Sequence, residues 1–179
     1  IERFLEPEFV RTLQRPPSSY SGHPFIVEAG IAYGGKIPEG GDIKIYRFAN
    51  KVPLLYDRTA GVCWKVVSKI DWSRYRVSQG MPVAIFVHIC STKVPYKGVG
   101  KEAIGDRPEI EKEIELALRK LGRELSLFLG RKRREAIMQK RSGIMRKYLE
   151  KIAEFSTQLA EKEEQPDVEP LLEEITLSR

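Results

Sequence analysis

The sequence predicts an α+β fold in which a small core of strands and helices is followed by a long helical arm. Short apolar and β-branched runs separated by Gly and Pro clusters occupy the first hundred residues. From Asp106 onward, charged residues and an apolar period near 3.6 replace them. Charged residues make up 31% of the chain and hydrophobic residues 41%, which is typical of long exposed helices attached to a smaller core.

Residues 1–21 predict a short amphipathic helix and a linker. The helix is expected over about residues 6–14, because "IERFLEPEFVRTLQ" is amphipathic. The following "RPPSSYSGHP" breaks regular structure with three prolines, a glycine and three serines. The chain opens on Ile1 with no signal-peptide pattern, and we expect it to be part of a longer protein.

Three later segments predict the strands of the core. "FIVEAGIAYGG" is apolar and ends in a double glycine, and "IKIYRFAN", after the turn "KIPEGGD", is expected to pair antiparallel with it. "KVPLLYD" extends this sheet or covers its edge. "PVAIFVHIC" is nearly all apolar, which predicts a central strand. Residues 61–71 fit a helix, since their valines and Ile70 fall at helical spacing.

The arm begins with helix-start signals. Asp106 suits an N-cap and Pro108 a first helical turn. One apolar stripe is expected to pack on the sheet: Ile110, Ile114, Leu118, Leu121, Leu125 and Phe128. Gly130 marks a bend or break. A seven-residue repeat then predicts a coiled-coil-like seam: Met138, Met145, Ile152 and Leu159, with Tyr148 and Phe155 at companion positions.

These features divide the chain into four parts. They are an N-terminal helix and Pro-rich linker (1–21), a core (22–130), an extended helical stalk (131–164) and a C-terminal tail segment (165–179). The tail "DVEPLLEEITLSR" has room for one short amphipathic helix.

Composition limits the chemistry. The net charge is +6 and the pI about 9.3, which favours an anionic partner such as nucleic acid. Cys63 and Cys90 lack metal or disulfide spacing, so a reduced, cytoplasmic setting and no metal are expected. No apolar run predicts a membrane span. His23 lies in a loop and His88 in the central strand, where a histidine with satisfied hydrogen bonds is expected, so no complete catalytic site is predicted.

The stretch "STKVPYKGVGKEAI" resembles a phosphate-binding loop but fails the pattern G-x-x-x-x-G-K-[ST]. Gly100 and Lys101 fit, whereas Pro95 replaces the first glycine and Glu102 the hydroxyl residue. What remains is a glycine-flanked loop that presents three lysines: Lys93, Lys97 and Lys101.

Two further segments are candidates for DNA contact. Arg131, Lys132, Arg133 and Arg134 are consecutive cations at a predicted helix break. They are either a solvated face or a sequence-independent contact to DNA phosphates. "DWSRYRV" groups Trp72, Arg74 and Tyr75, which either anchor a helix end on the sheet or contact a protein or DNA.

Four motifs together resemble the transducer domain of the B subunit of DNA topoisomerase VI, a type IIB enzyme. They are "RPPSSYSGHPFIVEAGIAYGG", "RFANKVPLLYD", "IDWSRYRV" and "VHICSTKVPYKGVGKEAI", and the resemblance covers about residues 1–155. It implies the transducer-type α/β sandwich of the GHKL ATPases, similar to ribosomal protein domain 2, with a left-handed crossover. It also implies that the ATP-binding and helix-two-turn-helix domains lie upstream.

In this family a switch lysine from the loop meets the γ-phosphate of ATP in the neighbouring ATPase domain. Lys101 is the preferred match, with Lys97 and then Lys93 as alternatives, and Gly98 and Gly100 are the loop hinges. ATP and Mg²⁺ would be held mainly by the upstream domain, and neither would be bound by this chain alone.

The resemblance also implies DNA and protein contacts. A short basic loop with a Gly-Arg-Lys core matches Gly130, Arg131 and Lys132, and a W-K-x-Y motif matches residues 72–75, with Ser73 departing from it. The tail residues Leu171, Leu172 and Ile175 are placed like the segment that contacts the DNA-cleaving A subunit.

Two functions remain open at this point. The first is a relay in an ATP-dependent topoisomerase that passes double-stranded DNA through a double-strand break and relaxes supercoils. Its partners would be the A subunit, double-stranded DNA and a second B subunit joined through the upstream domain, in a prokaryotic, archaeal-type cytoplasm. The alternative is a stand-alone basic nucleic-acid-binding module with a similar fold.

Overall fold

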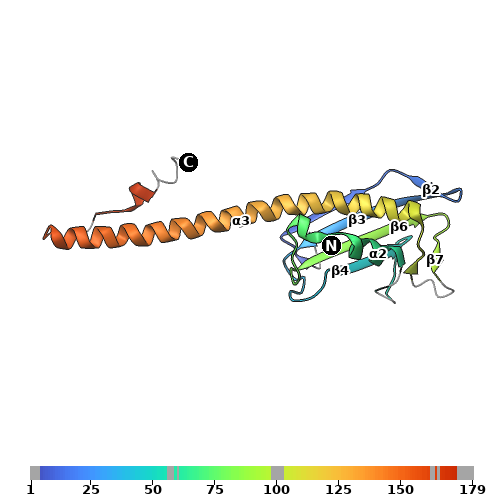
Figure 1. The fold of residues 1–179 in the computed structure, drawn as a ribbon, viewed down its shortest axis with the longest axis horizontal. Coiled ribbons are helices and arrows are strands. Elements are labelled where there is room, and N and C mark those ends of the chain that lie inside the picture. The colour runs from blue at the N-terminus through green and yellow to red at the C-terminus, as the bar shows by residue number, and fades with distance from the viewer. Residues whose placement is uncertain are drawn as a thin grey trace. The chain divides into compact units, whose positions relative to one another are not determined.

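The computed structural model describes residues 5–55, 59, 61–97, 103–161, 164 and 166–172 (Figure 1). The chain forms two compact units, residues 1–129 and residues 130–179.

The elements follow one another as strands, short helices and one long helix. In order they are β1 (Phe9–Gln14), β2 (Ser18–Tyr20), β3 (His23–Tyr33), β4 (Lys44–Ala49), β5 (Val52–Pro53), α2 (Gly61–Lys69), the 3₁₀ helix η1 (Trp72–Tyr75), β6 (Val83–Ser91), β7 (Tyr96–Lys97), β8 (Ala103–Ile104) and α3 (Pro108–Leu159). The predicted strands of the core, the helix after Gly61 and the start of the long helix at Pro108 are confirmed.

The main sheet has the order β1-β3-β6-β4-β5, with β2 pairing β3. β6 is central, as its apolar sequence predicted, and β5 extends the sheet at its edge. The predicted pairing of β4 was wrong: β4 runs parallel to β6, from Lys44↔Ala84 to Ala49↔Ile89, and does not pair with β3. Parallel neighbours require a crossover, and β5 and α2 supply it. The sheet is therefore mixed, with a crossover connection at its centre.

The predicted helix over residues 6–14 was also wrong, because β1 occupies most of that segment. β1 pairs antiparallel with β3 from Phe9↔Tyr33 to Gln14↔Glu28. Phe9 and Leu13 lie four residues apart, a spacing that suits one face of a helix and also one face of a strand. The local pattern therefore left the choice open, and the unpaired edge of β3 decided it.

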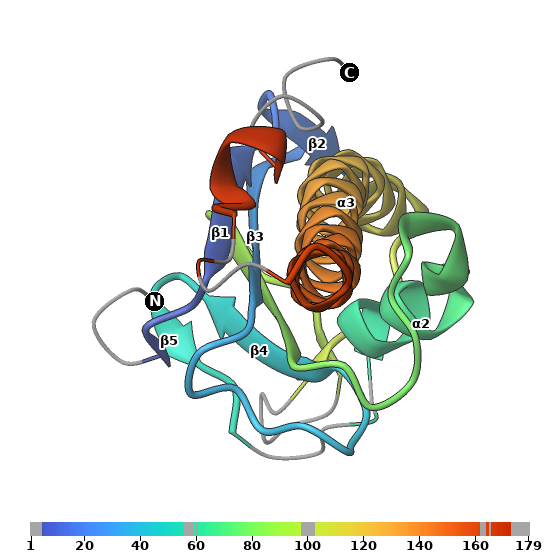
Figure 2. The same ribbon diagram turned by 90° about the vertical axis from the view of Figure 1, so that its left-hand side faces the viewer.

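The core lies between the sheet and the helices on one of its faces (Figure 2). Ile31 of β3 and Ile85 of β6 are fully buried there. The predicted stripe of α3 packs on this face, with Ile110, Ile114, Leu118, Leu121 and Leu125 at most 1% exposed and Phe128 partly buried. The Phe128 ring contacts Phe9 of β1, with the ring centroids 4.9 Å apart and the planes tilted by 30°. The N-terminal part of α3 is therefore an integral layer of the first unit.

The helix α3 is continuous through Gly130, so the predicted break there was wrong, and a bend there stays a prediction. A glycine inside a helix costs about 1 kcal/mol, and the flanking Leu, Arg and Lys residues are good helix formers. The sum of their propensities over a long helix outweighs one glycine.

The second unit contains the rest of α3 and a short tail. The predicted seam is exposed, with Met138 52%, Met145 41% and Ile152 61% exposed. The tail begins a helical turn, where the Leu172 amide donates to the Val168 carbonyl. An ion pair between Arg146 and Glu169 joins the tail to α3.

Candidate functional site

The loop that carries the candidate lysines is closed at its base by paired backbone. β7 and β8 form an antiparallel pair, Tyr96↔Ile104 and Lys97↔Ala103. Ala103 and Ile104 are buried, and α2 contacts β8. Gly61 at the start of α2 has φ +81°, and a Cβ there would lie 2.5 Å from the Ile104 carbonyl oxygen. The downstream end of the loop is therefore fixed to the core.

The upstream end of the loop is fixed by a hydrogen-bond network around Ser91. The Asn50 side chain donates from Nδ2 to the Ser91 carbonyl (3.0 Å) and accepts from the Ser91 amide (2.9 Å). The Ser91 hydroxyl donates to the Pro24 carbonyl at 2.9 Å. The Lys93 amide lies 3.2 Å from the same hydroxyl oxygen, to which it donates. The chain therefore leaves β6 along a defined path before it reaches the lysines.

The candidate lysines separate into described and undescribed positions. Lys93 and Lys97 are exposed, and Lys97 is the last residue of β7. Lys101, Gly98 and Gly100 lie outside the described residues. The switch and hinge assignments therefore remain predictions, although both ends of the loop that contains them are fixed.

The 3₁₀ helix η1 holds the second candidate motif. Asp71 caps it, because its carboxylate accepts from the Ser73 amide and hydroxyl, and the hydroxyl hydrogen bond lowers the pKa of Asp71. The Trp72 indole Nε1 donates to the Val67 carbonyl at 2.9 Å. The polar edge of this tryptophan is therefore engaged inside the unit, whereas the Arg74 side chain is 79% exposed.

Tyr75 fixes η1 to the long helix through a glycine. A Cβ added to Gly122 of α3 would lie 2.9 Å from the Tyr75 ring, so only glycine permits this close approach. Sequence analysis missed this contact, because a lone glycine in a helical pattern gives no sign of its partner. Trp72 and Tyr75 thus have an anchoring role in the structure, and a DNA role for them stays a prediction.

The run of four cations lies within α3. The family resemblance placed Gly130, Arg131 and Lys132 in a short loop, but all three are helical. Arg131, Arg133 and Arg134 are exposed, and Lys132 takes part in an interaction. Consecutive residues of a helix point in different directions, so these cations surround the helix instead of forming one face.

The tail candidates differ from one another. Leu171 is 50% exposed, whereas Leu172 is 7% exposed. Ile175 lies outside the described residues. A partner contact by these residues stays a prediction.

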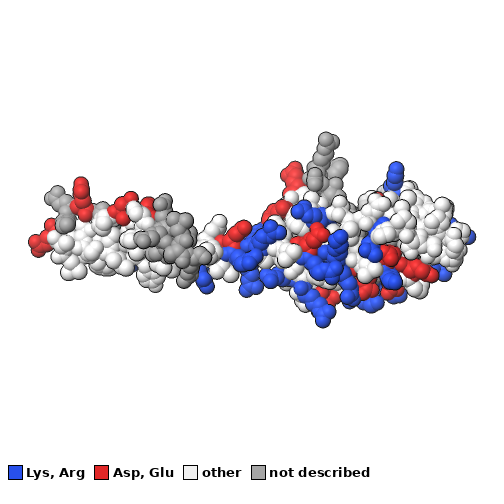
Figure 3. All heavy atoms as spheres, turned by 90° about the horizontal axis from the view of Figure 1, so that it is seen from above, with Lys and Arg blue, Asp and Glu red and all other residues white. Residues whose placement is uncertain are grey.

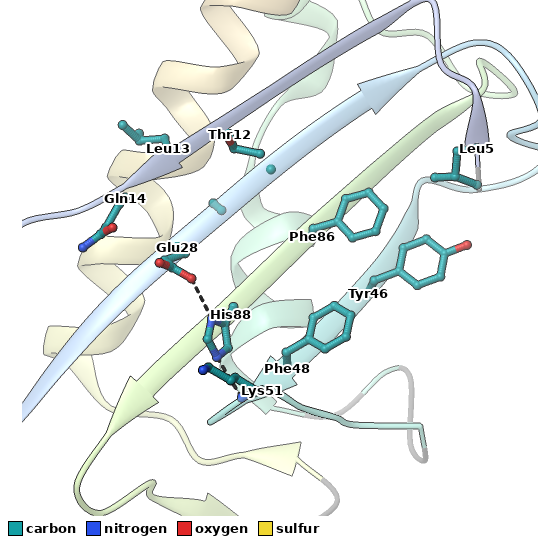
Figure 4. Close-up of a pocket in the computed structure, with 12 residues that line it drawn as sticks. Leu5, Thr12, Leu13, Gln14, Glu28, Tyr46, Phe48, Lys51, Phe86 and His88 are labelled. Carbon is teal, nitrogen blue, oxygen red and sulfur yellow. Dashed lines mark hydrogen bonds and ion pairs between the residues drawn. The ribbon is translucent and has the colours of Figure 1, made fainter. Parts of the chain in front are cut away.

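A shallow groove of about 800 Å³ lies on the sheet face opposite the helices (Figure 4). Tyr46 and Phe86 stack in it, 4.8 Å apart and 9° from parallel. His88 is also there, with Nδ1 2.8 Å from a Glu28 carboxylate oxygen and Nε2 accepting from the Lys51 amide at 3.0 Å. Both ring nitrogens are engaged, which confirms the expected satisfied histidine.

Two buried groups lie between β4 and α2. Arg47 is 4% exposed and donates from Nη2 to the Leu54 carbonyl at 3.3 Å. Burial raises the pKa of the nearby Cys63 thiol to about 12, and the positive charge of Arg47 acts in the opposite direction. A thiol protonated at neutral pH is a poor nucleophile, so Cys63 is a packing residue.

Ion pairs join α2 to the first turns of α3. Glu111 Oε2 lies 2.8 Å from Lys65 Nζ, and its other oxygen lies 3.5 Å from Lys69 Nζ. The hydrogen bond from Lys65 lowers the pKa of Glu111, and the same bond raises the pKa of Lys65. Sequence analysis missed this contact, since nothing in the local pattern names a partner 46 positions away.

The sequence profile described as "Topoisomerase VI B subunit, transducer" matches residues 1–141. The chain belongs to this family. The transducer chain is also 45% identical over 161 residues to the B subunit of type 2 DNA topoisomerase 6 from Saccharolobus solfataricus, and to its counterpart from Saccharolobus islandicus. These matches cover 89% of the transducer chain and 30% of each relative. The chain thus spans about a third of the length of the curated relatives it matches.

Among solved structures, the transducer chain is similar to the B subunit of DNA gyrase from Myxococcus xanthus. The TM-score is 0.42 at 16% identity, covering 64% of this chain and 38% of the gyrase chain. Within the described residues, no helix is long and apolar enough to cross a membrane. The same residues contain no group of three or more His, Cys, Asp or Glu side chains that could hold a metal ion.

Proposed function

We propose that this chain is the transducer region of the B subunit of an ATP-dependent type IIB DNA topoisomerase. It relays ATP binding and hydrolysis from a GHKL domain to a DNA-cleaving A subunit. Its partners are that A subunit, double-stranded DNA and a second B subunit that dimerises through the ATPase domain. The proposal rests on membership of the transducer family, whose profile matches residues 1–141.

The connection between the lysine loop and α3 carries the proposal. β8 closes the loop, and only Gly105–Arg107 separate it from Pro108 at the start of α3. The Gly105 amide also donates to the Pro95 carbonyl at 2.6 Å, across the base of the same loop. A shift of the loop on meeting a phosphate would therefore act directly on the first turn of the helix.

Nucleotide and metal would be held mainly outside this chain. The described residues offer no acidic cluster for Mg²⁺. A lysine side chain is a flexible point charge suited to pairing with a terminal phosphate. We therefore assign this chain one contact to ATP, made by Lys101, and no share in binding the metal.

A chimera tests the proposal. The matching region of the Saccharolobus solfataricus B subunit is replaced by this chain, and the chimeric protein is assembled with its A subunit. ATP-dependent relaxation of supercoiled DNA is then measured beside the unmodified enzyme. We expect relaxation to be retained. A chimera that folds, assembles and hydrolyses ATP but never relaxes DNA would contradict the relay.

A further inference from the structure

The outer face of α3 in the first unit carries a stripe of one charge sign. Between residues 112 and 127, the side chains that point away from the sheet are Lys112, Leu116, Arg119, Lys120, Arg123 and Leu127, all of them exposed. We call these six residues the outer stripe. Figure 3, which looks down on α3, shows Lys and Arg side chains gathered over this part of the molecule.

Four glutamates beside the outer stripe pair with cations of neighbouring elements, whereas Glu109, in the turn before Lys112, is exposed and has no ion pair among the described residues. On the α2 side, Glu111 and Glu115 pair with lysines of α2, at 2.8 Å for Lys65–Glu111 and 3.5 Å for Lys69–Glu115. On the β1 side, Glu113 pairs with Arg15 at 2.7 Å. Glu124 lies 3.8 Å from Arg11. These carboxylates therefore leave the charge of the stripe largely uncompensated.

The cations of the stripe repel one another. Lys112, Lys120 and Arg123 have no ion pair with any other described residue, and Arg119 shares Glu115 at 2.6 Å. Arg119 and Arg123 are four residues apart and Lys120 and Arg123 three, so they are neighbours on the helix surface. Like charges at this spacing destabilise a helix, and a bound anion would relieve the repulsion.

η1 adds two arginines beside the stripe. The Tyr75–Gly122 contact holds η1 against α3. Arg74 is 79% exposed, with Nε 3.6 Å from an Asp71 carboxylate oxygen, and Arg76, which ends η1 at φ +63°, is also exposed. The aromatic residues of the motif point into the unit, so its arginines are the groups available to a partner.

We propose that the outer stripe, with Arg74 and Arg76, binds the phosphate backbone of duplex DNA. This inference deepens the proposed function and rests on it for the identity of the polyanion. Arginine matches phosphate with two parallel hydrogen bonds. Leu116 and Leu127 lie about 16 Å apart along the helix, so they form no apolar anchor of the kind a protein partner needs.

A charge-neutralising variant tests the assignment. Lys112→Gln, Lys120→Gln and Arg123→Gln are combined in the 179-residue chain, and binding to a short mixed-sequence duplex is followed by fluorescence anisotropy over a range of KCl. Each phosphate contact contributes about 0.9 to the slope of log K against log salt. We expect the slope to fall by about 2.7 and the affinity at low salt by at least about tenfold.

The matched control removes the same charge elsewhere. The control combines Lys36→Gln, Lys44→Gln and Lys51→Gln, at positions on β4 and in the turns beside the sheet. Lys36 is paired with Glu6 at 2.7 Å. We expect this variant to keep most of the wild-type slope. Equal losses in the two variants would overturn the site, because they would show that only net charge matters. Far-UV circular dichroism confirms that both variants are folded.

A polyglutamate chain of matched charge separates DNA from an acidic protein. We expect it to compete poorly with the duplex at equal salt. If the wild-type chain binds polyglutamate as tightly as DNA, and the stripe variant loses both equally, the DNA assignment is wrong. The relaxation assay of the chimera is independent of these measurements. If the chimera relaxes DNA and the stripe variant of the 179-residue chain binds DNA as tightly as wild type, this inference is refuted and the proposed function stands.

Discussion

At the scale of single residues, the fold depends on positions that no other residue type can occupy without displacing a neighbour. Gly122 is the clearest case, because the Tyr75 ring occupies the space of its missing Cβ. Gly143 lies in the same helix and has no atom within 4 Å of that position. The two glycines share a backbone conformation and differ only in their surroundings.

These two glycines give opposite predictions for the same substitution. Gly143→Ala should raise stability by about 0.5–1 kcal/mol, because alanine is the better helix former. Gly122→Ala should lower it by about 1–3 kcal/mol, since an added methyl forces the Tyr75 ring to move. Thermal unfolding followed by circular dichroism checks both. A stabilised Gly122→Ala chain would show that the Tyr75 contact is loose.

The two cysteines predict a second residue-scale result. Cys90 is exposed and should react with a thiol reagent in the folded chain, whereas buried Cys63 should react only on unfolding. Quantifying released chromophore with and without denaturant checks this, and Cys90→Ser should abolish the fast reaction. Fast modification of Cys63 in that variant would contradict the prediction.

Cys63 also predicts alkaline behaviour. Its pKa is raised from 9.0 to about 12 in the fold, so the folded state keeps a proton that the unfolded state loses above pH 9. The free energy of unfolding should therefore fall between about pH 9 and 12, by at most about 1.4 kcal/mol per pH unit. Urea unfolding at several pH values, compared with Cys63→Ala, isolates the contribution of this thiol.

At the scale of elements, the position of α3 is set by apolar burial on one side and ion pairs on two flanks. Burial of the apolar stripe outweighs the pairs of α2 and β1 with α3, because partly exposed ion pairs each contribute at most about 1 kcal/mol. Glu111 is the residue that joins α2 to α3 through two lysines.

Glu111→Gln should lower stability by up to about 1 kcal/mol at neutral pH, since both lysines are half exposed. The folded pKa of Glu111 lies below its usual 4.5, so its contribution is present above pH 4.5 and is lost as the pH falls through the lowered value. The difference in the free energy of unfolding between Glu111→Gln and wild type should therefore shrink on acidification, as urea unfolding at several pH values would show.

Glu109→Gln, in the same first turn and without an ion pair among the described residues, is the control and should show little effect. A constant difference down to acidic pH would rule out the charge of Glu111 as its cause.

At the scale of the whole molecule, the proposed relay depends on one lysine of the loop. Lys101→Ala in the intact B subunit, assembled with its A subunit, should abolish ATP turnover and relaxation while DNA affinity is nearly unchanged. The matched variants Lys97→Ala and Lys93→Ala should retain activity. If Lys97→Ala is the inactive variant, the switch lies in β7 and not beyond it. If all three are active, a plain nucleic-acid-binding module explains the basic charge better.

Much of the fold follows from sequence period alone. The apolar run of β6 predicted a central strand, the spacing of Val62, Val66 and Val67 predicted the helix α2, and the stripe of α3 predicted both that helix and its buried face. These predictions succeeded because burial of a periodic apolar face is a local property of the chain. The family resemblance added the expected switch role of Lys101, which the glycine spacing of the loop had brought to notice without assigning it a partner.

Tertiary structure decided what local pattern left open. β1 forms a strand because the edge of β3 offers backbone hydrogen-bond partners. β4 pairs with β6 and not with β3, which its sequence could not specify, because backbone hydrogen bonds do not depend on side-chain identity. Gly122 contacts Tyr75 and Glu111 pairs with Lys65, and these residues are too far apart in the sequence for a periodic pattern to predict their contact. The sequence by itself determined which faces are apolar and where charge gathers. Only the folded chain determined which partners those faces and charges meet, because pairing depends on distance in space.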